Sequence, residues 1–332
     1  MKSNVFLLII CFLCAIIILG DYIMLQKLGI KAKRFDLHCH TPASDGSKEL
    51  IDLLIDAENA KLDVISFTDH DTLDVYEYLK DIDYKKWYSG KIIYGVEITV
   101  EFQDERYEVL AYNFDYEKLR KYKYFQKLYD EKVVEKQTQK LVDKARKMGF
   151  VFEPLKEKET YRRPCIWGPV YSGIMANKEQ NEALIKKYKI TDGKHFCRVL
   201  FSQKGQPFYL KANYIPSIKK ICKIIHKCGG VCIFAHPFNY GAKNVGSILE
   251  RIRSITDIDG IECAHSAHTK EQIKYLVDYC DKYELMKTAG SDFHGRERFY
   301  ENGLYNFKFG YLGAKGDLKP ITDKTIGYKW KN

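Results

Sequence analysis

The chain has 332 residues, of which 45% are hydrophobic and 30% are charged, and this composition excludes general disorder. The length suits one large domain or two small ones with a sizeable buried core. The formal net charge of +10 suits an acidic partner, such as a phosphate ester, a nucleic acid or an anionic membrane face. Charge alone does not choose among these partners.

An apolar segment opens the chain. Residues 5–20 carry no charged side chain, and the apolar run resumes at residues 22–25 after the single Asp21. Such a run can just span the hydrocarbon core of a bilayer as a helix, so residues 1–34 are predicted to form an N-terminal transmembrane helix with a basic flank. A cleaved signal peptide is the alternative, although only Lys2 charges its start and no clear small-x-small cleavage site follows.

Basic residues around this segment predict its orientation. Lys2 stands alone before it, whereas Lys27, Lys31, Lys33 and Arg34 follow it. Because basic flanks stay on the cytoplasmic side, we expect a single-pass protein of the cell membrane with its body in the cytoplasm. Two of the ten cysteines lie in the segment, and the other eight form no Cys-x-x-Cys pair, which favours free thiols in a reducing compartment.

Beyond the segment, short apolar runs alternate with helical patterns. Strand-like runs occupy residues 34–40, 63–67, 91–97, 107–112, 230–235, 260–263 and 285–290, and helical stripes occupy 49–61 and 218–227. Strands separated by helices predict a parallel sheet, and therefore an α/β barrel or a doubly wound fold. Strand patterns are scarce between about 117 and 209, where we expect a mostly helical insertion.

Histidines and acidic residues gather where the predicted strands end. His38 and His40 are two residues apart on one strand, so both rings point to the same face. Other strand ends carry Asp45, His70, Glu97, His236, Asp292 and His294. Chemically active groups at the carboxyl ends of parallel strands are typical of a barrel active site. The mixture of imidazoles and carboxylates predicts a site for Mn²⁺, Fe²⁺ or Zn²⁺ rather than for Ca²⁺ or Mg²⁺ alone. A structural role explains one such histidine but not the whole set.

Seven short motifs occur in a fixed order. They are Asp-Leu-His-Cys-His-Thr (36–41), Ser-Asp-Gly (44–46), Thr-Asp-His-Asp-Thr (68–72), Gly-Val-Glu (95–97), Ala-His-Pro (235–237), Gly-Ile-Glu (260–262) and Gly-Ser-Asp-Phe-His-Gly (290–295). In this order and spacing the chain resembles the PHP (polymerase and histidinol phosphatase) family. It is most similar to the stand-alone phosphoesterases, which include nucleoside 3′,5′-bisphosphate phosphatases and 5′-to-3′ oligoribonucleases. The resemblance runs from about residue 35 to 295 and is interrupted by the insertion.

The resemblance implies a fold and a ligand set. The fold would be an α/β, distorted seven-stranded (β/α) TIM-like barrel at residues 35–310, with the helical insertion at about 117–209 and a C-terminal tail at 311–332. Carried over position by position, the metal ligands would be His38, His40, Asp45, His70, Glu97, His236, Asp292 and His294. Glu97 would bridge two metals of a three-metal cluster. We therefore expect two to three divalent ions per chain, with Mn²⁺ leading and Zn²⁺ or Fe²⁺ as alternatives.

The chain departs from the family pattern at two positions. Glu108 stands where relatives carry a histidine ligand; it can still bind a hard metal ion, but it adds negative charge. The Arg-Pro-His sequence of relatives is Arg163-Pro164-Cys165 here. Arg163 remains a candidate phosphate clamp, because guanidinium grips phosphate bidentately, with a surface salt bridge as the alternative. His265 and His268 match a His-x-x-His pattern of relatives that faces substrate, although packing at a helix start is equally open for His268.

These residues predict a metal-dependent phosphoesterase. We expect it to hydrolyse a phosphomonoester of a nucleotide or short oligonucleotide by attack of a metal-bridging hydroxide, with Arg163 stabilising charge. The proton for the leaving alcohol could come from His265, from Asp71 or from metal-bound water. No predicted strand ends in lysine, which counts against the carbamylated lysine of amidohydrolases. The alternative is a non-catalytic PHP module with a structural or regulatory role. Expected partners are a small phosphorylated substrate, such as a nucleotide or short RNA, and the membrane.

Overall fold

The computed structural model describes residues 35–126, 131–154, 166–211, 215–240, 244–295, 298–300 and 303–305. The predicted membrane segment at 1–34, the candidate clamp Arg163 and the tail at 311–332 lie outside these residues. Within the described ranges, no helix combines the length and the apolar character that a membrane crossing requires.

Two sheets form the body. The first holds β1 (Phe35–Cys39), β2 (Val64–Phe67) and β3 (Lys91–Ile92), all parallel. The second holds, in spatial order, β4 (Gly95–Phe102), β5 (Glu105–Tyr112), β6 (Val231–Phe234), β7 (Gly260–His265) and β8 (Met286–Gly290). Strands β6 to β8 are parallel, whereas β5 runs antiparallel to both β4 and β6. The protein is therefore an α/β fold with a mixed second sheet.

Single bridges join the two sheets along both edges. Cys39, the last residue of β1, bridges Phe293 just beyond β8, and His70, just beyond β2, bridges Glu97 in β4. The His40 N–H donates to the Phe293 carbonyl at 2.8 Å, and the Asp71 N–H donates to the Glu97 carbonyl at 2.7 Å. Backbone hydrogen bonds thus tie together the strand ends that carry the predicted site.

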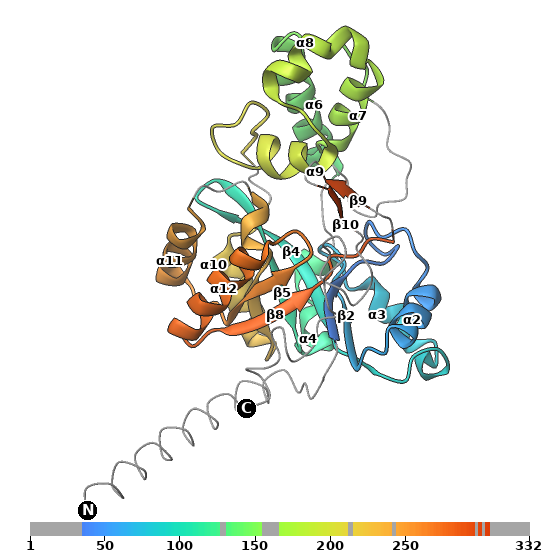
Figure 1. Cartoon of the computed structure of the whole chain (residues 1–332). Coiled ribbons are helices and arrows are strands. Elements are labelled where there is room, and N and C mark those ends of the chain that lie inside the picture. Colours follow the sequence, from blue (N-terminus) through green and yellow to red (C-terminus); the bar gives the residue numbers. More distant parts are fainter. Residues whose placement is uncertain are drawn as a thin grey trace, which may run out of the picture.

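Helices cover the outside of the sheets (Figure 1). They are α2 (Leu50–Asn59), α3 (Asp74–Lys80), α10 (Ile218–Lys227), α11 (Val245–Ile255) and α12 (Lys270–Lys282), with short turns η1 (Tyr84–Lys86) and η3 (Pro237–Tyr240). Helix α10 buries Ile218, Ile221, Cys222 and Ile225, which are spaced as one helical face. Helix α12 begins with a capping box between Thr269 and Gln272. Together with both sheets these helices enclose the main hydrophobic core.

Every regular element that the structure describes between Tyr112 and Ile218 is helical. These are α4 (Tyr116–Leu119), α5 (Lys123–Gln126), α6 (Glu131–Lys147), α7 (Gly168–Ala176), α8 (Lys178–Tyr188), α9 (Gly193–His195) and η2 (Phe196–Phe201). Figure 1 shows α6 to α9 gathered at one end of the molecule, above the sheets, with the hairpin of β9 (Arg298–Tyr300) and β10 (Gly303–Tyr305) between them. Leu141, Phe150, Ile174 and Phe208 belong to a second hydrophobic core within these helices.

Two expectations about the strands were wrong. The predicted strand at 91–97 is two strands in different sheets, because β3 ends at Ile92 and β4 begins at Gly95. Glu97 is therefore the third residue of β4 and does not lie at the carboxyl end of a strand. The expected parallel order also fails at β5, because a two-residue turn at Gln103 and Asp104 reverses the chain. Both turn residues have positive φ (55° and 68°), a conformation usually signalled by glycine or asparagine, which this turn lacks.

Gly290 allows β8 to approach β1, and this contact yields a stability prediction. A Cβ atom at residue 290 would lie 2.1 Å from the His38 Cβ and 2.7 Å from the His38 backbone nitrogen. Gly290→Ala should therefore destabilise the fold by about 1–3 kcal/mol. Thermal unfolding should show a drop in Tm of several degrees, at about 2–4 °C per kcal/mol.

Gly246→Ala is the matched control, because its added methyl meets the flexible end of the Tyr275 side chain, which can move away. An equal Tm for the Gly290→Ala variant and the native chain would show that β8 and β1 are not in the tight contact described.

Candidate metal centre

All nine predicted metal ligands meet at one buried centre. They come from the ends of β1, β2, β6 and β8, from the turn after β1, and from β4 and β5. Four overlapping groups each place one ligand atom per residue within 4.8 Å of the others: His38, His236, Glu262 and His265; His40, Asp45, His70 and His294; His38, His40, Glu97 and Asp292; and His70, Glu97 and Glu108. The sequence spacing thus translates into spatial proximity for every predicted ligand.

Glu97 lies in the middle of the centre. Its Oε2 atom is 3.3 Å from the Nε2 atom of His38, 3.3 Å from the Nε2 atom of His40 and 3.1 Å from the Nδ1 atom of His70. Atoms that bind one ion at right angles, about 2.1 Å from it, stand about 3 Å apart. Three ring nitrogens around one carboxylate oxygen therefore have the spacing of atoms that share metal ions.

Several buried polar atoms of the centre have no hydrogen-bond partner among the described residues. They include the Nε2 atom of His38, both ring nitrogens of His40, Oε2 of Glu97 and Oδ1 of Asp292. Leaving a buried polar atom unsatisfied is costly, and native proteins rarely do so. Their concentration at one place, on nitrogen and carboxylate atoms, fits a site for divalent ions.

The pKa shifts of His40, His236 and Glu97 agree with this interpretation. Burial and then the neighbouring His294 lower the pKa of His40 to about 3, and burial and Arg198 lower the pKa of His236 well below its usual range. Both rings are thus neutral at pH 7, which is the form that binds metals. Burial and the Glu108 carboxylate raise the pKa of Glu97 to about 8. The charged form of Glu97 is therefore disfavoured, and a divalent ion beside it would reverse that preference.

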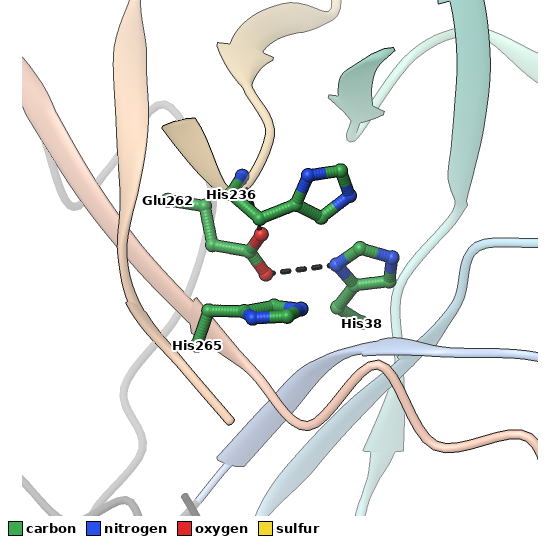
Figure 2. A group of neighbouring side chains, drawn as sticks. All are labelled: His38, His236, Glu262 and His265. Carbon is green, nitrogen blue, oxygen red and sulfur yellow. Dashed lines mark hydrogen bonds and ion pairs between the residues drawn. The ribbon is translucent and has the colours of Figure 1, made fainter. Parts of the chain in front are cut away.

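Glu262, in β7, orients two of the histidines. Figure 2 shows its carboxylate between His38 and His236. The Nδ1–H of His38 donates to Oε1 at 2.8 Å, and the backbone N–H of His236 donates to Oε2 at 2.9 Å. Both carboxylate oxygens are thus engaged, and the Nε2 atom of His38 faces Glu97 and Asp292. Glu262 is therefore placed to orient the His38 ring, as carboxylates do for metal-binding histidines, because both of its oxygens are already engaged. Its motif was noticed in the sequence, but its role required the fold.

Two residues of the centre have strained backbones. His236 has φ of +25° and Asp292 has φ of +55°, in the left-handed region that non-glycine residues rarely adopt. Such strain persists only where the surroundings hold it, and it is concentrated at functional sites. The Glu262 carboxylate on the His236 N–H and the His38 carbonyl on the Asp292 N–H supply that support.

His265 lies in the centre with its tautomer fixed. Its Nδ1 atom accepts the Ala267 N–H at 3.0 Å, so a neutral ring carries its proton on Nε2. Nε2 lies 3.3 Å from Oδ2 of Asp292, and Figure 2 shows the ring beside His38. Burial lowers the pKa of His265 well below its usual range. A protonated Nε2 cannot bind a metal but can donate a hydrogen bond, so His265 is placed as a hydrogen-bond donor.

The other candidates have more limited roles. Asp71 is buried, but its Oδ1 accepts the Thr99 N–H at 2.8 Å and also the Tyr124 hydroxyl, so its carboxylate ties the loop after β2 to β4 and α5. His268 contacts the Cys263 carbonyl at 3.0 Å through Nδ1, as expected for packing at a helix start. Arg163 lies outside the described residues.

Two cations of the centre were missed in the sequence. Lys194 and Arg198 come from the helical insertion, where no strand-end motif marks them. The Lys194 Nζ atom lies 3.4 Å from Oδ2 of Asp292, and the Arg198 Nη2 atom lies 3.5 Å from Oε2 of Glu108. Their spacing of four residues within a helical stretch is the only sequence signal that could have paired them.

The role of Glu262 can be tested through metal affinity. Glu262→Gln keeps the side-chain shape but leaves one acceptor for two donors, so His38 or the His236 backbone loses its partner. Losing such an orienting group typically costs about 10–100-fold in metal affinity, and calorimetric titration with Mn²⁺ should show that loss. Glu250→Gln, on the exposed side of α11, is the control and should bind Mn²⁺ normally. Unchanged affinity in Glu262→Gln would mean that the histidines are held by other contacts.

Comparison with known proteins places this centre in a family. The PHP domain family matches residues 36–243. A 5′-3′ exoribonuclease of Haemophilus influenzae is 27% identical over 274 residues, covering 79% of this chain and 90% of that protein. The 5′-3′ exoribonuclease Rnm of Escherichia coli is 24% identical over 276 residues, covering 78% and 85%.

Two solved structures share the fold. One, ascribed to a metal-dependent phosphoesterase from Bifidobacterium adolescentis, has a TM-score of 0.52 and 20% identity, covering 81% of this chain and 91% of that one. An amidohydrolase from Chromobacterium violaceum, with bound sulfate, has a TM-score of 0.56 and 18% identity, covering 87% and 93%. The family match spans more than half of the chain and includes the residues of the metal centre from His38 to His236. The chain therefore belongs to the PHP domain family, and it is a hydrolase of phosphoric ester bonds of the PHP type.

Proposed function

We propose that this chain hydrolyses a phosphomonoester of a nucleotide or of a short oligonucleotide. The observation that carries the proposal is the buried cluster around Glu97, where unsatisfied imidazole and carboxylate atoms stand at the spacing of metal ligands. The relatives named 5′-3′ exoribonucleases support an RNA fragment as the substrate. The net charge of +10 suits such an anionic partner.

The ions would be two or three in number, with Mn²⁺ preferred. The residues that would hold them are His38, His40, Asp45, His70, Glu97, Glu108, His236, Asp292 and His294. When bound, divalent ions lower the pKa of water to give a nucleophile near pH 7 and neutralise charge on the attacked phosphate. Glu108, a carboxylate in place of the histidine of relatives, favours a hard ion such as Mn²⁺.

The protein's own groups orient the reactants. Glu262 fixes the His38 ring so that its Nε2 atom faces the centre. The Ala267 N–H holds His265 in the tautomer that presents Nε2–H, and Asp292 aligns that proton. His265 can thus donate a hydrogen bond from Nε2 to the leaving oxygen, whereas the Asp71 carboxylate is engaged with Thr99 and Tyr124. Arg163 stays a candidate phosphate clamp.

The metal requirement gives the first test. The full-length protein in detergent, depleted of metal, should not cleave an aryl phosphate, and Mn²⁺ should restore turnover best. His40→Ala and Asp292→Ala should lower kcat/KM by about 100-fold or more, because each removes a ligand of the ions that stabilise the transition state. Elemental analysis should show less bound metal in both variants.

Asp278→Ala, on the exposed face of α12, is the control and should keep its rate and metal content. If the native chain holds no metal and gains no activity with Mn²⁺, the alternative of a non-catalytic PHP module is correct.

We also propose that the strands form the distorted seven-stranded barrel of the family. Strands β1, β2 and β4 to β8 would form the wall, since the bridges Cys39–Phe293 and His70–Glu97 link the two sheets at both junctions. A ring of strands brings the residues of both sheets to one end, where the insertion also lies.

A membrane anchor at residues 1–34 is proposed from the sequence alone. The uncharged run at 5–20 and the four basic residues that follow it favour a single-pass segment with the catalytic body in the cytoplasm. There the enzyme would meet nucleotides and RNA fragments. The boundaries of the catalytic domain (35–310), the insertion (about 117–209) and the tail (311–332) are proposed with it.

This placement predicts fractionation and protease protection. The protein should sediment with membranes, and protease added to intact cells should spare the body until the cells are lysed. A protein that is membrane-bound in the same orientation, with a known cytoplasmic domain, serves as the control. Digestion in intact cells, or a mature N-terminus near residues 21–26, would instead support secretion.

A further inference from the structure

The helical stretch at residues 193–201 carries two cations into the metal centre. Helix α9 continues directly into η2, which is a π-helical segment. Such segments are rare in proteins overall, but those that occur are often found at functional sites. Lys194 and Arg198 are four residues apart on this stretch, so their side chains lie on the same face. The Asp192 side chain accepts the His195 N–H at 2.8 Å and fixes the start of the stretch.

Apolar contacts hold this stretch in place. Phe196, Leu200 and Phe201 are buried in the second hydrophobic core, and the Phe196 ring centroid lies 4.5 Å from that of Phe208. The Arg106 guanidinium of β5 stacks over the Phe201 ring at 3.8 Å, and the backbone N–H of Arg106 donates to the Ser202 carbonyl. The apolar side chains thus anchor the stretch to the insertion and to β5, while the two cations point to the metal centre.

The contacts of Arg198 with the centre are long. Its Nη2 atom lies 3.4 Å from Nε2 of His236, 3.5 Å from Oε2 of Glu108 and 3.9 Å from Oδ2 of Asp292. Charge-assisted hydrogen bonds are normally 2.7–2.9 Å long. The Nη1 atom of Arg198 is buried and has no hydrogen-bond partner in the described part of the chain. The guanidinium therefore points into the centre with donor capacity that these carboxylates do not use.

The charges of the centre explain why the cations are there. The guanidinium of Arg198 is charged at neutral pH, as arginine is in proteins generally, and it faces the carboxylates of Glu108 and Asp292. If the same carboxylates bind divalent ions, their charge is shared with those ions, and the two cations are left to attract a further anion. The long contacts to Glu108 and Asp292 are compatible with such an exchange of partners.

We propose, on the basis of the phosphoesterase function above, that Lys194 and Arg198 bind the phosphate group that the metal centre attacks. The chemical class of ligand is a terminal phosphate, which carries about two negative charges and three non-bridging oxygens at neutral pH. Arg198 offers the guanidinium fork that matches two such oxygens, and Lys194 adds a point charge. A phosphodiester carries one charge and two non-bridging oxygens, so it has less to offer a metal cluster and two cations together.

Inorganic phosphate and dimethyl phosphate are the probes that test this assignment. Calorimetry on the metal-loaded full-length protein in detergent should show that inorganic phosphate binds more tightly than dimethyl phosphate. Arg198→Met and Lys194→Met should each weaken phosphate binding about tenfold or more and reduce the preference over dimethyl phosphate. Arg198→Lys keeps the charge without the fork and should give an intermediate Kd. Elemental analysis should show an unchanged metal content.

Arg146→Met and Lys186→Met are matched controls on the same insertion, and both should bind phosphate as the native chain does. Phosphate affinity within twofold of native in Arg198→Met overturns the assignment, as does a loss of metal from that variant, which would make Arg198 a support of the metal ligands. If phosphate binding depends on Arg198 but no ester is hydrolysed, the anion site stands and the proposed function fails. If ester hydrolysis is retained while phosphate binding ignores Arg198, the function stands and the anion site fails.

Discussion

The Glu97 carboxylate, buried among the ring nitrogens of four histidines, is the constraint on which the rest of the site depends. Burial and the nearby Glu108 raise the pKa of Glu97 to about 8, so its charged form is disfavoured in the protein alone. A divalent ion beside Oε2 would favour the charged form of Glu97, and the lone pairs of the histidine nitrogens could coordinate the same ion. The ligands therefore favour metal binding for an electrostatic reason. Without positive charge, several carboxylates and neutral imidazoles would face one another at about 3 Å with unsatisfied atoms.

The fold brings these ligands together mainly through its backbone. Glu97 belongs to the second sheet and His38 and His40 to the first, so the site exists only where the sheets join. The bridges at Cys39–Phe293 and His70–Glu97 lie within three residues of six of the predicted ligands: His38, His40, His70, Glu97, Asp292 and His294. Gly290 permits β8 to approach β1 closely, and Asp292 follows two residues later in a strained conformation. The strain at Asp292 is thus held at the junction of β1 with β8, whereas the strain at His236 is held by Glu262 of β7.

The sequence predicted which residues gather at the centre better than it predicted the strands. Histidines and acids are chemically distinctive, and their order along the chain survives whichever way a strand runs. The direction of β5 depends on a turn at Gln103 and Asp104. Both residues have positive φ angles, but neither is a glycine or an asparagine, the residue types from which such a turn is usually predicted. Contributions from distant segments were also hidden. Glu262 appeared as part of a motif without a role, because its partners His38 and His236 are far from it in sequence. Lys194 and Arg198 appeared as ordinary charges of a helical insertion.

Asp45 shows how a ligand outside the sheets can still be positioned. It lies in the turn after β1 and is 30% exposed, yet its Oδ1 atom is 3.1 Å from Nε2 of His294. The buried Asp69 carboxylate accepts the Thr41 N–H at 2.8 Å, the Thr41 hydroxyl at 2.7 Å and the Ser44 hydroxyl at 2.6 Å. These three bonds fix both sides of the turn against the end of β2. Burial raises the pKa of Asp69 to about 7 although the three donors oppose this shift. The hydrogen bonds therefore offset part of the cost of burying a carboxylate, and Asp69 orders the turn that carries Asp45 to the metal centre.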